Sequence, residues 1–174
     1  MNISISHAKP EDVKEIQQVF YRTWLDTYPN KEAGITVDDI RHKYKDRLSD
    51  EGLKERAERL KSMPAEEKFL VAKEDGVVVG VCGVVVHKDK NQLRAIYVLP
   101  EHQRKGIGGM LWKEALKYLD STKETVIEVV TYNTKAIEFY KKLGFVDTGR
   151  RFSDERFRMK SGAILPEMEM VLKV

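Results

Sequence analysis

The chain has 174 residues, 41% of them hydrophobic, and its 31 basic and 28 acidic side chains leave a net charge of +3. This length suits one domain, residues 1–174, with an ordinary core, and so small a basic excess argues against a nucleic-acid partner. A single cysteine excludes a cysteine-rich zinc site, so no metal is expected, and the lack of a signal-like N-terminus or a long apolar run predicts a cytoplasmic protein without a membrane partner.

The first third of the chain is predicted to be mostly helical. A short strand around residues 3–5 precedes a helix whose apolar residues recur at helical spacing up to Trp24. Thr36 as an N-cap, with Asp39 three residues later, predicts the start of a second helix. Residues 50–62 are predicted to form a polar third helix.

Strand-forming residues predominate from residue 69 onwards. The predicted strands span 69–72, 77–86 and 93–98, with a turn at Asp75-Gly76. Gly80 and Gly83 lie inside the second of these strands, which indicates a bulge or a close approach of another segment.

Helices and strands alternate in the rest of the chain. The apolar pattern predicts helices at 107–119 and 133–143 and strands at 125–131, 145–148 and 164–172. A longer loop, with a turn at 160–162, is expected between the last two strands. Hairpin strands followed by strand–helix units predict one α/β (α+β) domain.

The segment Gln103–Gly109 reads QRKGIGG and lies between a predicted strand and a predicted helix. Its glycines let backbone N–H groups approach a ligand, and the first N–H groups of a helix have no intrahelical partner. The helix dipole favours negative charge there, so phosphate oxygens are the expected occupants. The spacing fits neither a Walker phosphate loop nor a Rossmann fingerprint, whose third glycine position is Leu111 here.

Two longer strings resemble a known family. The run LRAIYVLPEHQRKGIGGMLWKEAL resembles motif A of the GNAT N-acetyltransferase superfamily, with Gln103, Gly106 and Gly108 at the positions of its Q/R-x-x-G-x-G/A pattern. The later run VVTYNTKAIEFYKKLGFVDTG resembles motif B of the same family. A weaker resemblance is to the PaiA-type polyamine acetyltransferases.

The resemblance implies a fold, a cofactor and a set of contacts. It implies a mixed, mostly antiparallel central sheet flanked by helices, with strands splayed around the cofactor slot. It also implies acetyl-CoA as cofactor and CoA as product. By position, the cofactor-binding residues would be Ile96, Tyr97, Val98, Arg104, Lys105, Gly106, Ile107, Gly108, Gly109 and Asn133. The backbone N–H of Val98 would be the hydrogen-bond donor to the carbonyl oxygen.

Tyr140 is the expected catalytic residue, a general acid. A phenol with a pKa of about 10 is protonated at neutral pH and can donate to a departing thiolate. Asn133 is expected either to contact the cofactor or only to cap its helix. Cys82 is expected in the core. The general base stays open: no single histidine stands out, and a water relay is preferred.

The acceptor is expected near the end of the first helix. There Trp24, Asp26 and Tyr28 could hold a cationic amine through ring faces and a counter-charge, or the two aromatic residues could simply be core. The PaiA-type resemblance implies a polyamine such as spermidine or spermine, whereas a similarity to ribosomal-protein N-terminal acetyltransferases implies a peptide N-terminus. A non-catalytic module that senses acetyl-CoA is a third alternative. The chain is expected to be a monomer or a homodimer.

Overall fold

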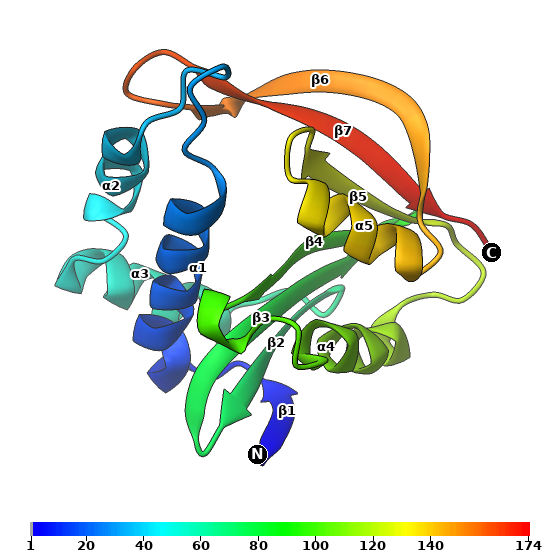
Figure 1. Ribbon diagram of the computed structural model, residues 1–174. Helices are drawn as coiled ribbons and strands as arrows, with labels where there is room; N and C mark the ends of the chain where they lie inside the picture. Colours follow the sequence, from blue (N-terminus) through cyan, green and yellow to red (C-terminus); the bar gives the residue numbers. More distant parts are fainter. Residues whose placement is uncertain (1) are drawn as a thin grey trace.

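The computed structural model describes residues 2–174, and Figure 1 shows their arrangement. The elements in chain order are β1 (Ile3–His7), η1 (Pro10–Asp12), α1 (Val13–Thr27), α2 (Val37–Lys45), α3 (Asp50–Lys61), β2 (Glu67–Glu74), β3 (Val77–Val86), β4 (Asn91–Val98), η2 (Pro100–His102), α4 (Ile107–Ala115), η3 (Leu116–Tyr118), β5 (Thr125–Val130), α5 (Thr134–Lys142), β6 (Val146–Arg158) and β7 (Ile164–Leu172). Over this range the strands form one seven-stranded sheet in the order β1-β2-β3-β4-β5-β7-β6. Neighbouring strands are antiparallel except for β4 and β5, which are parallel, so the expected mixed, mostly antiparallel sheet is confirmed.

Helices cover both faces of the sheet (Figure 1). On one face α1 packs on β3 and β4 and also contacts α2 and α3, and on the other face α4 packs on β2, β3 and β4. The approach of α4 is close because Gly80 has no side chain: a Cβ there would lie 3.2 Å from Leu111. A close approach at this glycine is therefore confirmed.

Strands β4 and β5 diverge soon after they begin. In the described chain, Asn91–Leu93 pairs in parallel with Thr125–Ile127, and no pairing extends beyond Leu93. The pairing of β4 with β3 also shifts register between Gly83 and Val84, which leaves Arg94 as an extra residue on β4. This bulge and the divergence confirm the expected pair of splayed strands and open the second half of β4 on its β5 side.

The predicted loop between the last two strands is wrong. Strand β6 continues from Val146 to Arg158, over thirteen residues, and pairs with β7 through two register shifts. Its sequence shows no apolar alternation because β6 is the exposed edge of the sheet, where charged side chains prevent pairing with other chains. The turn at 160–162 is confirmed, with Met159 N–H donating to the Ala163 carbonyl at 2.8 Å.

Helix ends follow local sequence signals. Thr36 caps α2, and its Oγ1 accepts a hydrogen bond from Asp39 N–H at 3.1 Å, as predicted. The predicted helix at 107–119 is α-helical to Ala115 and then tightens into the 3₁₀ turn η3. In residues 2–174 no helix is long and apolar enough to cross a membrane.

Candidate active site

The glycine-rich segment forms the turn into α4. Gly106 is the N-cap of α4 and has a φ of +82°, a left-handed conformation that favours glycine. No described side chain caps this helix, so its first N–H groups are left for a ligand. A Cβ at Gly106 or Gly109 would meet no described atom within 4 Å, and Arg104 and Lys105 are exposed beside them. These residues therefore fit the pyrophosphate of coenzyme A.

Gln103 ties the segment to β4 instead of facing outwards, because its Nε2 donates to the Val98 carbonyl at 3.0 Å. Ile107 is buried in the core, at 1% exposure. A Cβ at Gly108 would lie 3.2 Å from Phe139 and 3.7 Å from Ile96. The start of α4 thus packs against both β4 and α5. Its first backbone N–H groups remain free to bind a ligand.

The second half of β4 presents two N–H groups to the open side. Leu99 N–H donates to the Val79 carbonyl of β3 at 2.9 Å. Hydrogen bonding alternates along an antiparallel ladder, so the N–H groups of Val98 and Ile96 point the other way, towards the space left by β5. The N–H of Val98, predicted to be a hydrogen-bond donor, therefore faces the slot.

Tyr140 of α5 lies at this slot. It is 5% exposed, and its ring packs on those of Phe139 and Phe145. Burial raises the pKa of Tyr140, as do the neighbouring Tyr97 and Cys82, whereas a hydrogen bond from the Ile96 backbone lowers it in part. The Tyr140 hydroxyl is therefore protonated at neutral pH.

Asn133 is the N-cap of α5. Its side-chain oxygen accepts a hydrogen bond from Ala136 N–H at 3.2 Å. This contact is the capping role that the sequence left open. It sets the first residue of α5, the helix that carries Tyr140.

The aromatic residues of α1 lie on the opposite face of the sheet from α4. The rings of Trp24 and Tyr28 meet edge to face, with centroids 4.7 Å apart, and the Tyr28 hydroxyl lies 3.1 Å from that of Tyr97. Both rings are buried, so the structure brings Trp24 and Tyr28 together beside β4. Asp26, two residues after Trp24, lies on the exposed side of the helix and is not brought to them.

A cavity of about 560 Å³ lies between the helices α1–α3 and the sheet. Tyr97, Ala95 and Leu93 of β4 line it from the sheet, and Trp24 and Tyr44 line it from the helices. Because side chains alternate along a strand, Tyr97 faces this cavity while its neighbours on β4 face the opposite side. Strand β4 thus borders the cavity with one face and the slot with the edge that faces β5.

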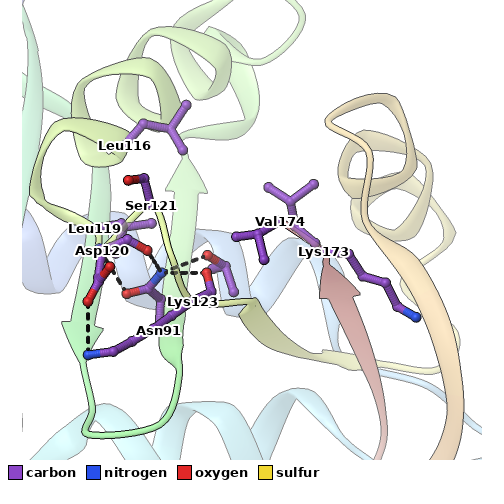
Figure 2. A pocket seen from close by; sticks show the side chains of 10 residues that line it. Asn91, Leu116, Leu119, Asp120, Ser121, Lys123, Lys173 and Val174 are labelled. Carbon is purple, nitrogen blue, oxygen red and sulfur yellow. Dashed lines mark hydrogen bonds and ion pairs between the residues drawn. The ribbon is translucent and has the colours of Figure 1, made fainter.

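A smaller cavity, of about 180 Å³, lies at the other end of β4 (Figure 2). Its central side chain is Asn91, whose Nδ2 donates to the carbonyls of Asp120 at 2.8 Å and Lys123 at 3.1 Å. Figure 2 shows these bonds joining the strand to the loop that follows η3. The Asn91 amide is used by the fold itself, so this cavity is structural.

Glu167 of β7 is a candidate that the sequence analysis missed. It lies opposite Val130 of β5, on the face towards the cavity, is 6% exposed, and its Oε2 has no hydrogen-bond partner in the described chain. Burial and the nearby carboxylates of Glu128 and Asp154 raise the pKa of Glu167 to about 7, against the opposing effect of Arg156. The alternation in LPEMEMVL puts Glu167 and Glu169 on one face of the strand, so no local signal distinguishes the buried acid from its neighbour.

Other candidates are engaged elsewhere. His87 Nε2 lies 3.0 Å from Gln92 Oε1, and His102 Nδ1 lies 2.9 Å from Glu74 Oε2, both outside the cavity lining. Cys82 is fully buried, as predicted, and burial raises the pKa of its thiol to about 12. A thiol that holds its proton so firmly is a poor nucleophile.

A splayed strand pair that leads into an uncapped, glycine-rich helix start is the architecture of acyltransferases that use acetyl-CoA. The chain belongs to the Acetyltransferase (GNAT) family, whose sequence model matches residues 18–145. It is therefore an acyltransferase of that family, with acetyl-CoA as donor.

Relatives of known description agree with this assignment. The chain is 27% identical over 177 residues to a protein described as a probable N-acetyltransferase of Mycobacterium tuberculosis, covering 96% of this chain and 91% of that protein. It is 29% identical over 155 residues to the spermidine N(1)-acetyltransferase of Thermoplasma acidophilum, covering 83% of this chain and 89% of the relative. The solved PaiA N-acetyltransferase of Thermoplasma acidophilum, in complex with coenzyme A, superimposes with a TM-score of 0.76 at 24% identity over all of both chains, which shows a shared fold.

Proposed function

We propose that the protein acetylates a primary amine by direct attack in a ternary complex, with the donor in the slot between β4 and β5 and the acceptor in the cavity beneath α1–α3. The observation that carries this proposal is that β4 borders both the slot and the cavity. The N–H groups of Ile96 and Val98 face the slot beside Tyr140, while the side chain of Tyr97 lines the cavity. Donor and acceptor would therefore lie next to the same strand, and the amine would reach the thioester through the gap that opens between β4 and β5 beyond Leu93.

Acetyl-CoA supplies an acetyl group activated as a thioester. The N–H of Val98 offers a hydrogen bond in the slot, which stabilises negative charge that develops on a carbonyl oxygen. Tyr140 holds a proton at its hydroxyl and gives it to the departing sulfur as the carbon–nitrogen bond forms and the carbon–sulfur bond breaks. Water can then return a proton to the tyrosine.

The attacking amine must also lose a proton, and Glu167 is our proposed acceptor for it. Its buried, unpartnered carboxyl lies on the cavity face and interacts electrostatically with Tyr97. A pKa of about 7 leaves part of the carboxyl ionised at neutral pH, which suits a group that takes up and releases a proton in each cycle. This assignment takes the place of the water relay that the sequence favoured.

A polyamine such as spermidine or spermine is the more specific acceptor that the sequence suggested. The similarity to the Thermoplasma spermidine N(1)-acetyltransferase supports it. The charge of the cavity opposes it, because seven basic and two acidic side chains line the cavity in the described chain. The buried Asp39 caps α2 and binds Ser161, so it is not free to hold a polycation. The geometry therefore supports a primary amine as acceptor in general, whereas the basic lining opposes a polyamine in particular.

An acceptor screen tests the proposal. Release of free thiol from acetyl-CoA would be followed with polyamines, amino acids, amino sugars and short peptides, and the acetylated amine would be confirmed by mass spectrometry. We expect CoA release in equal amount to acetylated product with at least one amine. Tight binding of acetyl-CoA without release on any amine would favour the sensing module, and turnover confined to peptides would favour N-terminal acetylation.

A further inference from the structure

We propose that the acceptor amine also carries an anionic group, a phosphate or a carboxylate, and that Lys43, Arg47 and Arg59 bind this group at the α2–α3 end of the cavity. The inference rests on the proposed function, because it assumes that the acceptor enters this cavity. It assigns a chemical class to the acceptor from the charges that surround the space.

Four cationic side chains come together on one wall of the cavity. Lys43 lies on α2, Arg47 in the turn that follows, and Arg56 and Arg59 on α3, and all four line the cavity. They are close enough to repel one another. Arg47 helps to lower the pKa of Lys43, and both Arg47 and Arg59 help to lower the pKa of Arg56, in each case after the larger effect of burial.

These cations lack the carboxylate partners that their neighbours have. Arg94 in the same lining pairs with Glu67 at 3.0 Å, and Arg156 pairs with Asp154. For residues 2–174, no ion pair involves Lys43, Arg47 or Arg59, and Arg56 reaches only the exposed Glu55, at 3.9 Å. Like charges gathered without counter-ions destabilise a fold and at the same time focus a positive potential that attracts an anion.

Lys43 is also held in position. Its Nζ lies 5.4 Å from the ring centre of Trp24 and 5.4 Å from that of Phe157, and the side chain is half-buried. Cation–π contacts of this kind orient an ammonium group without neutralising its charge. The ammonium group of Lys43 is therefore held at the cavity wall and can still pair with an anion.

An unsatisfied polar atom in the same cavity points independently to a ligand. Gln17 of α1 lines the cavity and is 6% exposed, and its Oε1 has no hydrogen-bond partner among the described residues. Buried polar atoms are almost always paired, so this oxygen is suited to an N–H or O–H donor of a bound molecule.

Charge is unevenly distributed around the cavity. Glu128 lines it beside Arg156, and Glu167, which is outside the lining, interacts with Tyr97, whereas the four cations cluster on the helical wall. An amine that carries a phosphate or a carboxylate matches both kinds of charge, whereas a polycation would put positive charge against four cations. A volume of about 560 Å³ is in the range of small-molecule sites, and it also suits the first residues of an acidic peptide.

Matched acceptor pairs test the class. We would compare ethanolamine with O-phosphoethanolamine and tyramine with tyrosine, with spermidine alongside, at fixed ionic strength. The anionic member of at least one pair should have a kcat/KM about tenfold higher, since charge-assisted bonds contribute on that scale. The phosphate and carboxylate pairs separate the two sources of charge. A preference for spermidine or for the members that lack an anionic group would overturn the proposal.

Variants locate the effect. The double variant Arg47→Ala/Arg59→Ala should lose the preference for the anionic amine, mainly through a higher KM. The control Lys45→Ala/Lys54→Ala changes two exposed lysines, one on α2 and one on α3, that do not line the cavity, and it should keep the preference. An equal preference in wild type and in the arginine variant would show that these arginines do not bind the acceptor.

A binding experiment needs no turnover. The CoA-saturated protein, in which the cofactor already occupies its own phosphate site, would be titrated with inorganic phosphate by calorimetry. Saturable binding that is lost in the arginine variant and kept in the lysine control supports the anion site, even if no amine is acetylated and the proposed function fails. Absence of saturable binding, together with turnover of amines that lack an anionic group, would overturn the inference and leave the proposed function standing.

Discussion

The hydroxyl oxygens of Tyr28 and Tyr97 lie 3.1 Å apart and join the end of α1 to β4, the strand that borders both slot and cavity. Burial raises the pKa of both phenols, so both keep their protons and one donates to the other. The Tyr132 hydroxyl adds a bond to the Tyr28 carbonyl at 2.7 Å, from the segment just before α5. Tyr28 is therefore a positioning residue that holds β4 against the acceptor side.

Tyr28→Phe or Tyr97→Phe alone should lower the free energy of unfolding by about 1 kcal/mol, because each leaves one buried hydroxyl without its partner. The double variant should lose less than the sum of the two single variants, since the second change removes a group that is already unpaired. Urea unfolding of the four proteins measures the coupling. Strictly additive losses would show that the two hydroxyls do not interact.

Tyr140→Phe should lower kcat by about a hundredfold and leave acetyl-CoA affinity nearly unchanged, because the ring still packs while the proton donor is gone. Steady-state kinetics and calorimetric titration with acetyl-CoA separate the two quantities. Tyr118→Phe is the control, since that ring packs on His7, with centroids 5.1 Å apart, well away from the slot. An unchanged kcat in Tyr140→Phe would remove this tyrosine from the acid role.

The loop glycines allow a matched comparison. Gly106→Ala and Gly109→Ala each add one Cβ that meets no described atom within 4 Å, but only Gly106 has a positive φ, +82°. Gly106→Ala should cost about 1 kcal/mol of conformational strain and weaken CoA binding, because the turn that aims the N–H groups of α4 is disturbed. Gly109→Ala adds its Cβ without this backbone strain and should weaken CoA binding less. Equal CoA affinities in the two variants would contradict this account of the turn.

The donor side of the site could be predicted from sequence because its signals are local. Gln103–Gly109 is one continuous segment, a turn followed by the start of α4, and the cap made by Asn133 depends on residues within a single helical turn. The cap at Thr36 was predicted for the same reason, whereas the bond from Ser161 N–H to Asp39 at 2.8 Å, 122 positions away, carries no local signal.

The acceptor side could not be predicted because it is assembled from distant segments. Arg47 and Arg59 read as ordinary surface charges until α2 and α3 are folded against the sheet. Glu167 becomes unusual only when β7 inserts between β5 and β6 and turns it towards Tyr97. The long β6 was missed for a related reason, since an exposed edge strand with charge pairs such as Arg150–Glu169, which joins it to β7, lacks the apolar alternation that predicts strands.

Glu167 should make the stability of the protein depend on pH. Its pKa is raised from 4.5 to about 7 in the folded chain, so between these values the native state holds a proton that the unfolded chain has lost. The free energy of unfolding therefore falls as pH rises through this window. Glu167→Gln should remove that fall, whereas Glu169→Gln on the same strand, which loses an exposed pair with Arg150, should keep it. Urea unfolding at several pH values measures both slopes.

Glu167 should also shape the pH dependence of catalysis. If its carboxylate takes the proton of the amine, kcat/KM of the wild type should rise with pH and level off near 7, where the carboxyl becomes ionised. Glu167→Gln should lower kcat and lose this step, leaving only the rise at higher pH from the ionisation of the acceptor amine itself. Glu169→Gln should keep the step. If Glu167→Gln and wild type had identical pH profiles, Glu167 would not be the general base, and a water relay would again be the preferred account.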